Sequence, residues 1–237
     1  MNRIKSHLKM HYINTKMSLI IFWSIMFAIS VLGILIALYA RSRGYNGTIT
    51  ISHMPAVVIF GAISGLVSYN ETLPYMLNMG ITRKNFILGY ALYNTVLSLI
   101  LSVIFTFLTL WESLLYNLLG FSNQQIGQIF TAFSIGEIFD RIWSCFIITL
   151  AVTAFFTLVG SIYYKKGIMY LFGIGAFIML VMFIPGVAAE VFRVLEYIIL
   201  YLTGDKGYLT MTLFSLAFFL ACYSIIYPLA RTSQVKR

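Results

Sequence analysis

Residues 17–40 read MSLIIFWSIMFAISVLGILIALYA and contain no charged side chain. An α-helix rises about 1.5 Å per residue, so roughly 20 apolar residues are enough to cross the ~30 Å hydrocarbon core of a bilayer. This stretch is long enough to do so, and it predicts a membrane-spanning helix. The rest of the chain is therefore interpreted as that of a membrane protein.

Five more uncharged stretches are long enough, or nearly so, to span a membrane: residues 49–70, 85–111, 142–164, 167–189 and 207–230. Of the 237 residues, 60% are hydrophobic and only 10% are charged, whereas soluble domains carry about 25% charged residues. The stretches are continuous rather than alternating over about ten residues, which excludes a β-barrel. We expect an all-α integral membrane protein, a single domain over residues 1–237 with six spans. A shorter apolar piece, 194–203, is expected to lie at the membrane interface or outside it.

Cations are distributed unevenly over the connections between these spans. One set of segments holds eleven of the 16 Lys and Arg residues: Arg3, Lys5, Lys9, Lys16, Arg83, Lys84, Lys165, Lys166, Arg231, Lys236 and Arg237. The alternate segments hold the other five, beside six of the seven acidic residues. By the positive-inside rule, both termini are expected in the cytoplasm. The net charge of +9 is then expected to face anionic lipid headgroups and not nucleic acid.

Motifs for catalysis are missing from the chain. It contains no G-x-x-x-x-G-K-[ST], no H-E-x-x-H and no G-x-S-x-G sequence, so a P-loop, a zincin site and a serine nucleophile elbow are unsupported. The three histidines are dispersed, and Cys145 and Cys222 have no partner at metal-ligand spacing. We expect no catalytic residue, metal site or cofactor in this chain.

Ion-driven transport also lacks its usual signal. Ionisable residues at membrane depth are costly and therefore stand out in a sequence. Glu71 and Glu112 lie at the ends of expected spans, where we expect them to be solvated or at headgroup level. If this protein transports a substrate, we expect the energy for transport to come from a soluble partner that binds a rigid cytoplasmic segment of the chain.

Residues 71–85 are the candidate for that feature. Their first part, ETLPYMLNM, is expected to form a short helix of its own, which Gly80 would end. Thr82 is expected to cap the third span, with Arg83 and Lys84 in its first turn. The alternative is an ordinary cytoplasmic turn whose cations only mark topology.

The second expected span carries small residues at one-turn spacing. Gly61, Gly65 and Ser68 continue this pattern along one face, and small residues let membrane helices approach closely. The pattern predicts helix packing, either inside one subunit or between subunits.

The sequence MGITRKNF, residues 79–86, resembles the permease subunits of ABC exporters of the ABC-2 type. In that family a Leu/Met-Gly-x-[ST]-Arg-[KR]-x-[FIL] stretch follows the second span. The resemblance implies a coupling helix that contacts an ATP-binding subunit through Leu77, Met79, Gly80, Thr82, Arg83, Lys84 and Phe86. It implies a smaller second contact at Lys165 and Lys166.

The same resemblance implies the remaining parts of such a transporter. Two permeases, identical or paralogous, would form a dimer in the lipid of the plasma membrane, and ATP and Mg would be bound by the partner ATPases and not by this chain. Sixteen tyrosines and 20 phenylalanines favour a hydrophobic or amphipathic cargo. Small permeases of this kind resemble those of Gram-positive bacteria that export antimicrobial or cytolytic peptides or give immunity to lantibiotics. The alternative is a non-transporting membrane scaffold, sensor or assembly protein.

Overall fold

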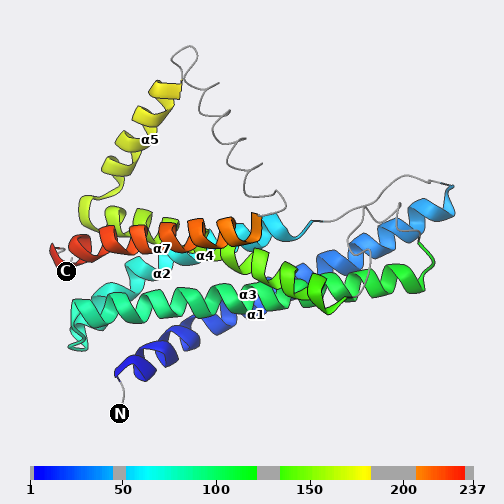
Figure 1. The fold of residues 1–237 in the computed structure, drawn as a ribbon, viewed down its shortest axis with the longest axis horizontal. Helices are drawn as coiled ribbons and strands as arrows, with labels where there is room; N and C mark the ends of the chain where they lie inside the picture. Colours follow the sequence, from blue (N-terminus) through cyan, green and yellow to red (C-terminus); the bar gives the residue numbers. More distant parts are fainter. Residues whose placement is uncertain (1–2, 45–51, 122–133, 183–206, 233–237) are drawn as a thin grey trace. The chain divides into compact units, whose positions relative to one another are not determined.

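The computed structural model describes residues 3–44, 52–121, 134–182 and 207–232. The regular elements in these ranges are all α-helices (Figure 1): α1 (Arg3–Ser42), α2 (Met54–Asn78), α3 (Arg83–Leu118), α4 (Ile135–Lys166), α5 (Ile168–Met182) and α7 (Gly207–Thr232).

Five helical stretches are long and apolar enough to cross a membrane: Thr15–Ser42 of α1, all of α2, α3 and α4, and Leu209–Thr232 of α7. The expected all-helical architecture is therefore confirmed for the described residues, with five helices capable of spanning a membrane. The fifth expected span, 167–189, is described only as far as Met182. The predicted interfacial piece at 194–203 lies outside the described residues.

The helices form two compact units. Unit 1 comprises Met1–Ile59 and Val96–Phe146, and unit 2 comprises Phe60–Thr95 and Ile147–Arg237. Helices α2, α3 and α4 each contribute one part to both units.

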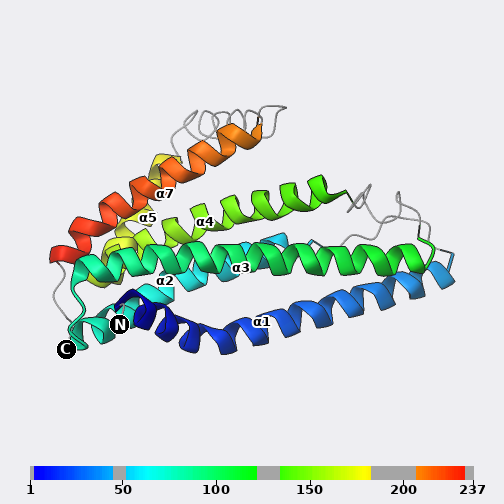
Figure 2. The same cartoon turned by 60° about the horizontal axis from the view of Figure 1, so that its bottom comes forward.

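In unit 1, α1 lies beside the second half of α3 (Figures 1 and 2). The rings of Phe27 and Trp111 have centroids 4.6 Å apart. Arg41 donates a hydrogen bond from Nη1 to the carbonyl oxygen of Leu119 at 2.8 Å, and its guanidinium lies 5.0 Å from the ring centroid of Phe121. The end of α1 and the end of α3 are thus together in unit 1, as expected for two ends that were predicted to lie on the same side of the membrane.

In unit 2, α2 packs closely on α4 through glycines. A Cβ added to Gly65 would lie only 2.7 Å from the carbonyl oxygen of Thr153, and one added to Gly160 only 2.9 Å from the carbonyl oxygen of Leu66. At Gly61 the added atom would meet the Thr153 methyl group at 3.3 Å. Of the two alternatives for the small-residue pattern, the structure thus describes packing inside one chain. The side chain of Ser68 lies outside the described part.

Helix α7 completes the packing of unit 2. Ser215 of α7 donates a hydrogen bond to the carbonyl oxygen of Ile147 in α4 at 3.0 Å. Nearby, the rings of Phe155 and Phe218 stack with centroids 6.4 Å apart. These contacts hold α7 against α4.

The expected separate short helix at residues 71–79 is wrong, because α2 runs unbroken to Asn78 with Pro74 inside it. An internal proline costs about 3 kcal/mol through its missing N–H. Leu73 and Met76 are fully buried and continue the packed face of α2. Burying two such side chains from water stabilises by roughly 3–6 kcal/mol, which offsets the cost of Pro74 and lets the helix continue to Asn78.

Candidate functional site

The turn between α2 and α3 has a defined hydrogen-bond pattern. The N–H of Gly80 donates to the carbonyl oxygen of Leu77 at 3.0 Å, and the N–H of Ile81 donates to that of Met76 at 3.1 Å. Together with a φ of 76° at Gly80, these bonds make a Schellman motif, in which a left-handed residue satisfies the last carbonyls of a helix. The expectation that Gly80 ends the preceding helix is confirmed.

Thr82 begins the next helix as expected. The N–H of Asn85 lies 3.5 Å from Thr82 Oγ1, and the N–H of Phe86 donates to the Thr82 carbonyl oxygen at 2.9 Å. These are the contacts of an N-cap residue, and α3 starts one residue later, at Arg83. Only residues 79–82 therefore separate two long helices, and both helix ends are capped.

Arg83 and Lys165 are held by α7 of the same chain. Arg83 donates from Nη1 to the carbonyl oxygens of Ala230, at 3.1 Å, and of Arg231. Lys165 donates from Nζ to Thr232 Oγ1 at 2.5 Å. These acceptors lie in the last turn of α7, where cations are favoured by the unpaired carbonyls and the helix dipole. The start of α3 and the ends of α4 and α7 therefore meet at one end of unit 2.

The seven residues of the implied coupling contact differ in exposure. Phe86 is 0% exposed, with ring centroids 5.7 Å from both Tyr69 and Tyr90, so its side chain is not available to a partner. Leu77 and Arg83 are half-buried. The exposed members are Met79, Gly80, Thr82 and Lys84.

Tyr75 belongs to the same exposed patch and was not expected from the sequence. Its side chain is 50% exposed, and Met79, four residues later, is 61% exposed. Residues four apart share one face of a helix, and this spacing is the signal that could have identified Tyr75. We call Tyr75, Met79, Gly80, Thr82 and Lys84 the turn surface. At the implied second contact, Lys166 is exposed, with its Nζ 5.7 Å from the ring centroid of Tyr170.

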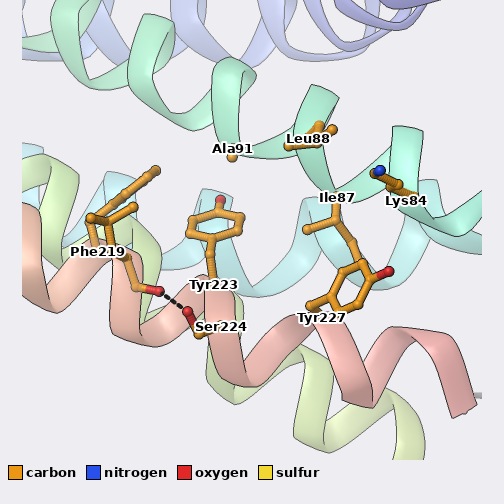
Figure 3. A pocket seen from close by; sticks show the side chains of 9 residues that line it. Lys84, Ile87, Leu88, Ala91, Phe219, Tyr223, Ser224 and Tyr227 are labelled. Atoms are coloured by element: carbon orange, nitrogen blue, oxygen red, sulfur yellow. Dashed lines mark hydrogen bonds between the residues drawn. The ribbon is translucent and has the colours of Figure 1, made fainter.

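Lys84 also lines a pocket of about 530 Å³ between α3 and α7 (Figure 3). The lining residues are mostly apolar and come from both helices: Lys84, Ile87, Leu88 and Ala91 of α3, and Phe219, Leu220, Tyr223, Ser224 and Tyr227 of α7. The sequence did not predict this pocket, because it depends on how two helices far apart in the chain pack together.

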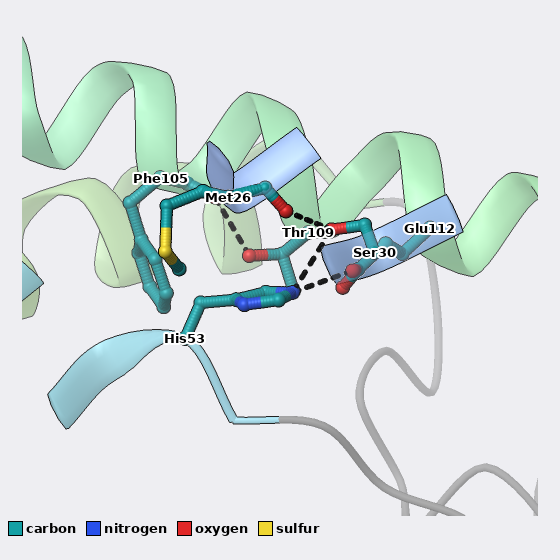
Figure 4. A network of polar contacts seen from close by, with 6 residues as sticks. All are labelled: Met26, Ser30, His53, Phe105, Thr109 and Glu112. Carbon is teal, nitrogen blue, oxygen red and sulfur yellow. Dashed lines mark hydrogen bonds and ion pairs between the residues drawn. The ribbon is translucent and has the colours of Figure 1, made fainter. Parts of the chain in front are cut away.

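A buried carboxylate–imidazole pair lies in unit 1 (Figure 4). The Nε2 atom of His53 is 2.6 Å from Glu112 Oε1 and 3.0 Å from Ser30 Oγ. Ser30 donates its own proton to the carbonyl oxygen of Met26 at 3.1 Å, so its oxygen can only accept from the ring. This network assigns the proton to Nε2, which donates to both oxygens.

This pair overturns the expectation for Glu112. The sequence placed Glu112 at a span end, solvated or at headgroup level, but α3 continues to Leu118 and the side chain is only 2% exposed. An isolated carboxylate is expensive to bury, and a hydrogen-bonded partner lowers that cost. The premise that the spans lack ionisable groups therefore does not hold at this position.

Ser30, His53 and Glu112 do not have the geometry of a hydrolytic triad. In a triad, the nucleophile and the carboxylate contact opposite ring nitrogens of the histidine. Here both oxygens contact Nε2. The arrangement joins an imidazole to a carboxylate, but it does not present a serine to a base.

A second buried polar cluster lies in unit 2. Asn94 donates from Nδ2 to Thr157 Oγ1 at 2.9 Å and to the Tyr223 hydroxyl oxygen at 2.8 Å. Thr157 donates onward to the carbonyl oxygen of Thr153 at 2.7 Å. Asn94 Oδ1 has no hydrogen-bond partner in the described part of the chain. The cluster joins α3, α4 and α7 through their polar side chains.

No protein-family model, curated protein or solved structure matches this chain.

Proposed function

We propose that this chain is the membrane-spanning subunit of an ATP-driven ABC exporter of the ABC-2 type. It has six spans with both termini in the cytoplasm, and it forms the path for a hydrophobic or amphipathic substrate, a peptide such as an antimicrobial or cytolytic one. It lies in the plasma membrane, with a Gram-positive bacterium as the expected source. The proposal is carried by the turn surface, an exposed feature between two capped helix ends that includes Met79, Gly80, Thr82 and Lys84 of the MGITRKNF sequence.

The geometry of the turn supports a role in coupling. A partner that pushes on residues 79–82 acts on α2 and α3 together, because the turn is short and both helix ends are capped. Met79 and Tyr75 offer exposed apolar area and Lys84 offers a positive charge. This combination suits a groove on a soluble protein that has an apolar floor and an acidic rim.

The cations of unit 2 support the proposed orientation. Arg83, Lys165 and Arg231 come from three connections that the positive-inside rule assigns to the cytoplasm. Hydrogen bonds link Arg83 and Lys165 to the last turn of α7, where Arg231 lies. The cations of unit 2 that are linked in this way lie at one end of the unit, as the positive-inside rule predicts for the end that faces the cytoplasm.

In this proposal the ATP-binding subunits supply the energy and hold the ATP and Mg. A second copy or paralogue of this chain completes the transport path. Closure of the two ATPases moves their bound turn surfaces, and the movement passes along α2 and α3. By thermodynamic linkage, the nucleotide state and the docking affinity must influence each other equally.

Co-purification from native membranes tests the proposal. The tagged chain is isolated in mild detergent, and the proteins that accompany it are identified and quantified by mass spectrometry. The test variant is Met79→Asp, which puts a charge on the turn surface. Leu118→Asp is the matched control, because Leu118 is an 81% exposed apolar residue at the other end of α3. Arg83 is avoided, since its replacement would also disturb α7.

The expected result is a stoichiometric P-loop ATPase with the wild-type chain and with Leu118→Asp, and its loss with Met79→Asp. An ATPase that stays with Met79→Asp would move the docking site elsewhere. A preparation without any ATPase would contradict the exporter proposal as a whole.

A membrane sensor is the second candidate, and the His53–Glu112 pair is the observation that favours it. Ionisable residues inside membranes are costly to bury and commonly mark functional sites such as proton pathways. A sensor of this kind would lack a partner ATPase and would lose its response in His53→Gln. The same co-purification experiment therefore separates the two candidates.

A further inference from the structure

The pocket between α3 and α7 has one polar end and one apolar end. Figure 3 shows Lys84 and Tyr227 at one end, Phe219 at the other, and Tyr223 between them. Leu88 forms part of the apolar wall. Its side chain is 57% exposed, so the wall is open to the surroundings of the helices.

Two of the hydroxyl groups that line the pocket already have partners. The hydroxyl of Tyr223 accepts a hydrogen bond from Asn94, and Ser224 donates to the carbonyl oxygen of Leu220 at 2.8 Å. Lys84 is exposed, and its ammonium group offers three donors and a positive charge. The pocket thus has a cation at one end, and the rest of its lining is mostly apolar.

We propose that this pocket binds one anionic phospholipid, with an acyl chain between Leu88 and Phe219 and the phosphate at Lys84. In a membrane, the open face between two spanning helices meets lipid tails and not water. A lysine near the ends of such helices attracts anionic headgroups in preference to zwitterionic ones. Lys84 is the second residue of α3, and a long lysine side chain near the end of a spanning helix can reach the headgroup layer.

This inference does not depend on the exporter proposal. It needs only that α3 and α7 cross the membrane, for which both are long and apolar enough. A soluble phosphate compound would be attracted by the charge of Lys84 but would make no apolar contact with the wall of the pocket. A helix of a second copy would use the wall but not the charge. The phospholipid uses both.

Native mass spectrometry of the full chain in detergent tests the site with two probes, phosphatidylglycerol and phosphatidylcholine of equal chain length. The variants are Lys84→Gln, which removes the charge, and Ala91→Phe, whose larger side chain fills the apolar part of the pocket. Lys166→Gln is the matched control, because Lys166 is also exposed but does not line the pocket. Thermal unfolding and particle mass are measured for every variant, so that misfolding or a change in oligomeric state is seen directly.

The wild-type chain and Lys166→Gln are expected to prefer phosphatidylglycerol by about fivefold, the selectivity that one lysine gives at a membrane surface. Lys84→Gln is expected to bind both lipids equally, and Ala91→Phe to bind both weakly while folded. An unchanged preference in Lys84→Gln, or an equal loss in Lys166→Gln, would overturn the site. So would competition by glycerol phosphate as strong as that by the lipid, or an Ala91→Phe variant that changes only the oligomeric state.

Discussion

At the scale of single residues, His53 and Glu112 form a close buried side-chain pair in the described part of unit 1. The two atoms are 2.6 Å apart and both side chains are almost fully buried. Such pairs are weak evidence for stability as a whole, because both polar groups lose their hydration on burial. Removing only one partner, however, leaves the other buried and uncompensated.

We expect His53→Leu to lower the free energy of unfolding by about 3–5 kcal/mol, because Glu112 is then left alone. The double variant His53→Leu/Glu112→Leu is expected to recover most of that loss, since neither buried polar group remains. Thermal unfolding in detergent measures both, with the exposed Glu71→Leu as control. A double variant as unstable as the single one would show that the two residues do not act as a pair.

Gly65 is the tightest point between α2 and α4 among the described glycines. Gly65→Ala is expected to cost roughly 1–3 kcal/mol, because its Cβ would lie 2.7 Å from the Thr153 carbonyl oxygen and the helices must move apart. Gly173→Ala is the matched control. It is a helix-interior glycine with open space around an added Cβ, so it should keep or slightly raise the unfolding temperature. Equal effects of the two substitutions would refute the close α2–α4 contact.

At the scale of elements, α3 links the turn surface to the opposite end of the helix in one 36-residue unbroken run. At a rise of about 1.5 Å per residue, a helix of this length is longer than the ~30 Å core of a bilayer. The two ends of α3 are therefore expected on opposite sides of the membrane. Both native cysteines are buried, which keeps the background of thiol labelling low.

Cysteines introduced at the end of α2 and at the end of α3 test this expectation, because only the short turn at residues 79–82 separates Asn78 from the start of α3. A membrane-impermeant maleimide should label Leu118→Cys in intact cells and Asn78→Cys only after permeabilisation. Both positions are exposed in the structure, so a failure to react reports on the membrane and not on burial. Labelling of Asn78→Cys in intact cells would reverse the proposed orientation.

The local sequence predicted where these helices end better than it predicted which residues they contact. Gly80 and Thr82 were predictable because helix caps use side chains and dihedral angles within a few residues. The continuation of α2 past Pro74 was not, because it depends on the burial of Leu73 and Met76. The helix propensity of a short segment contains no information on that burial.

At the scale of the whole molecule, apolar run length alone predicted the helical class, and the structure describes five helices long and apolar enough to span a membrane. The buried pair was not predictable, since His53 and Glu112 are 59 residues apart and meet only through the packing of unit 1. The same holds for the pocket between α3 and α7. The exposure pattern of the implied coupling residues also needed the structure, which buries Phe86 and engages Arg83 with α7.

The central claim is that the turn surface receives a soluble ATPase, and photo-crosslinking in living cells tests it most directly. A photoreactive amino acid is placed at Met79 in one strain and at Leu118 in another. We predict that irradiation joins position 79, and not position 118, to a single P-loop ATPase. Crosslinks from position 79 only to lipid or to unrelated membrane proteins, in a chain that is folded and inserted, would contradict the claim and leave the cations of the turn as markers of topology.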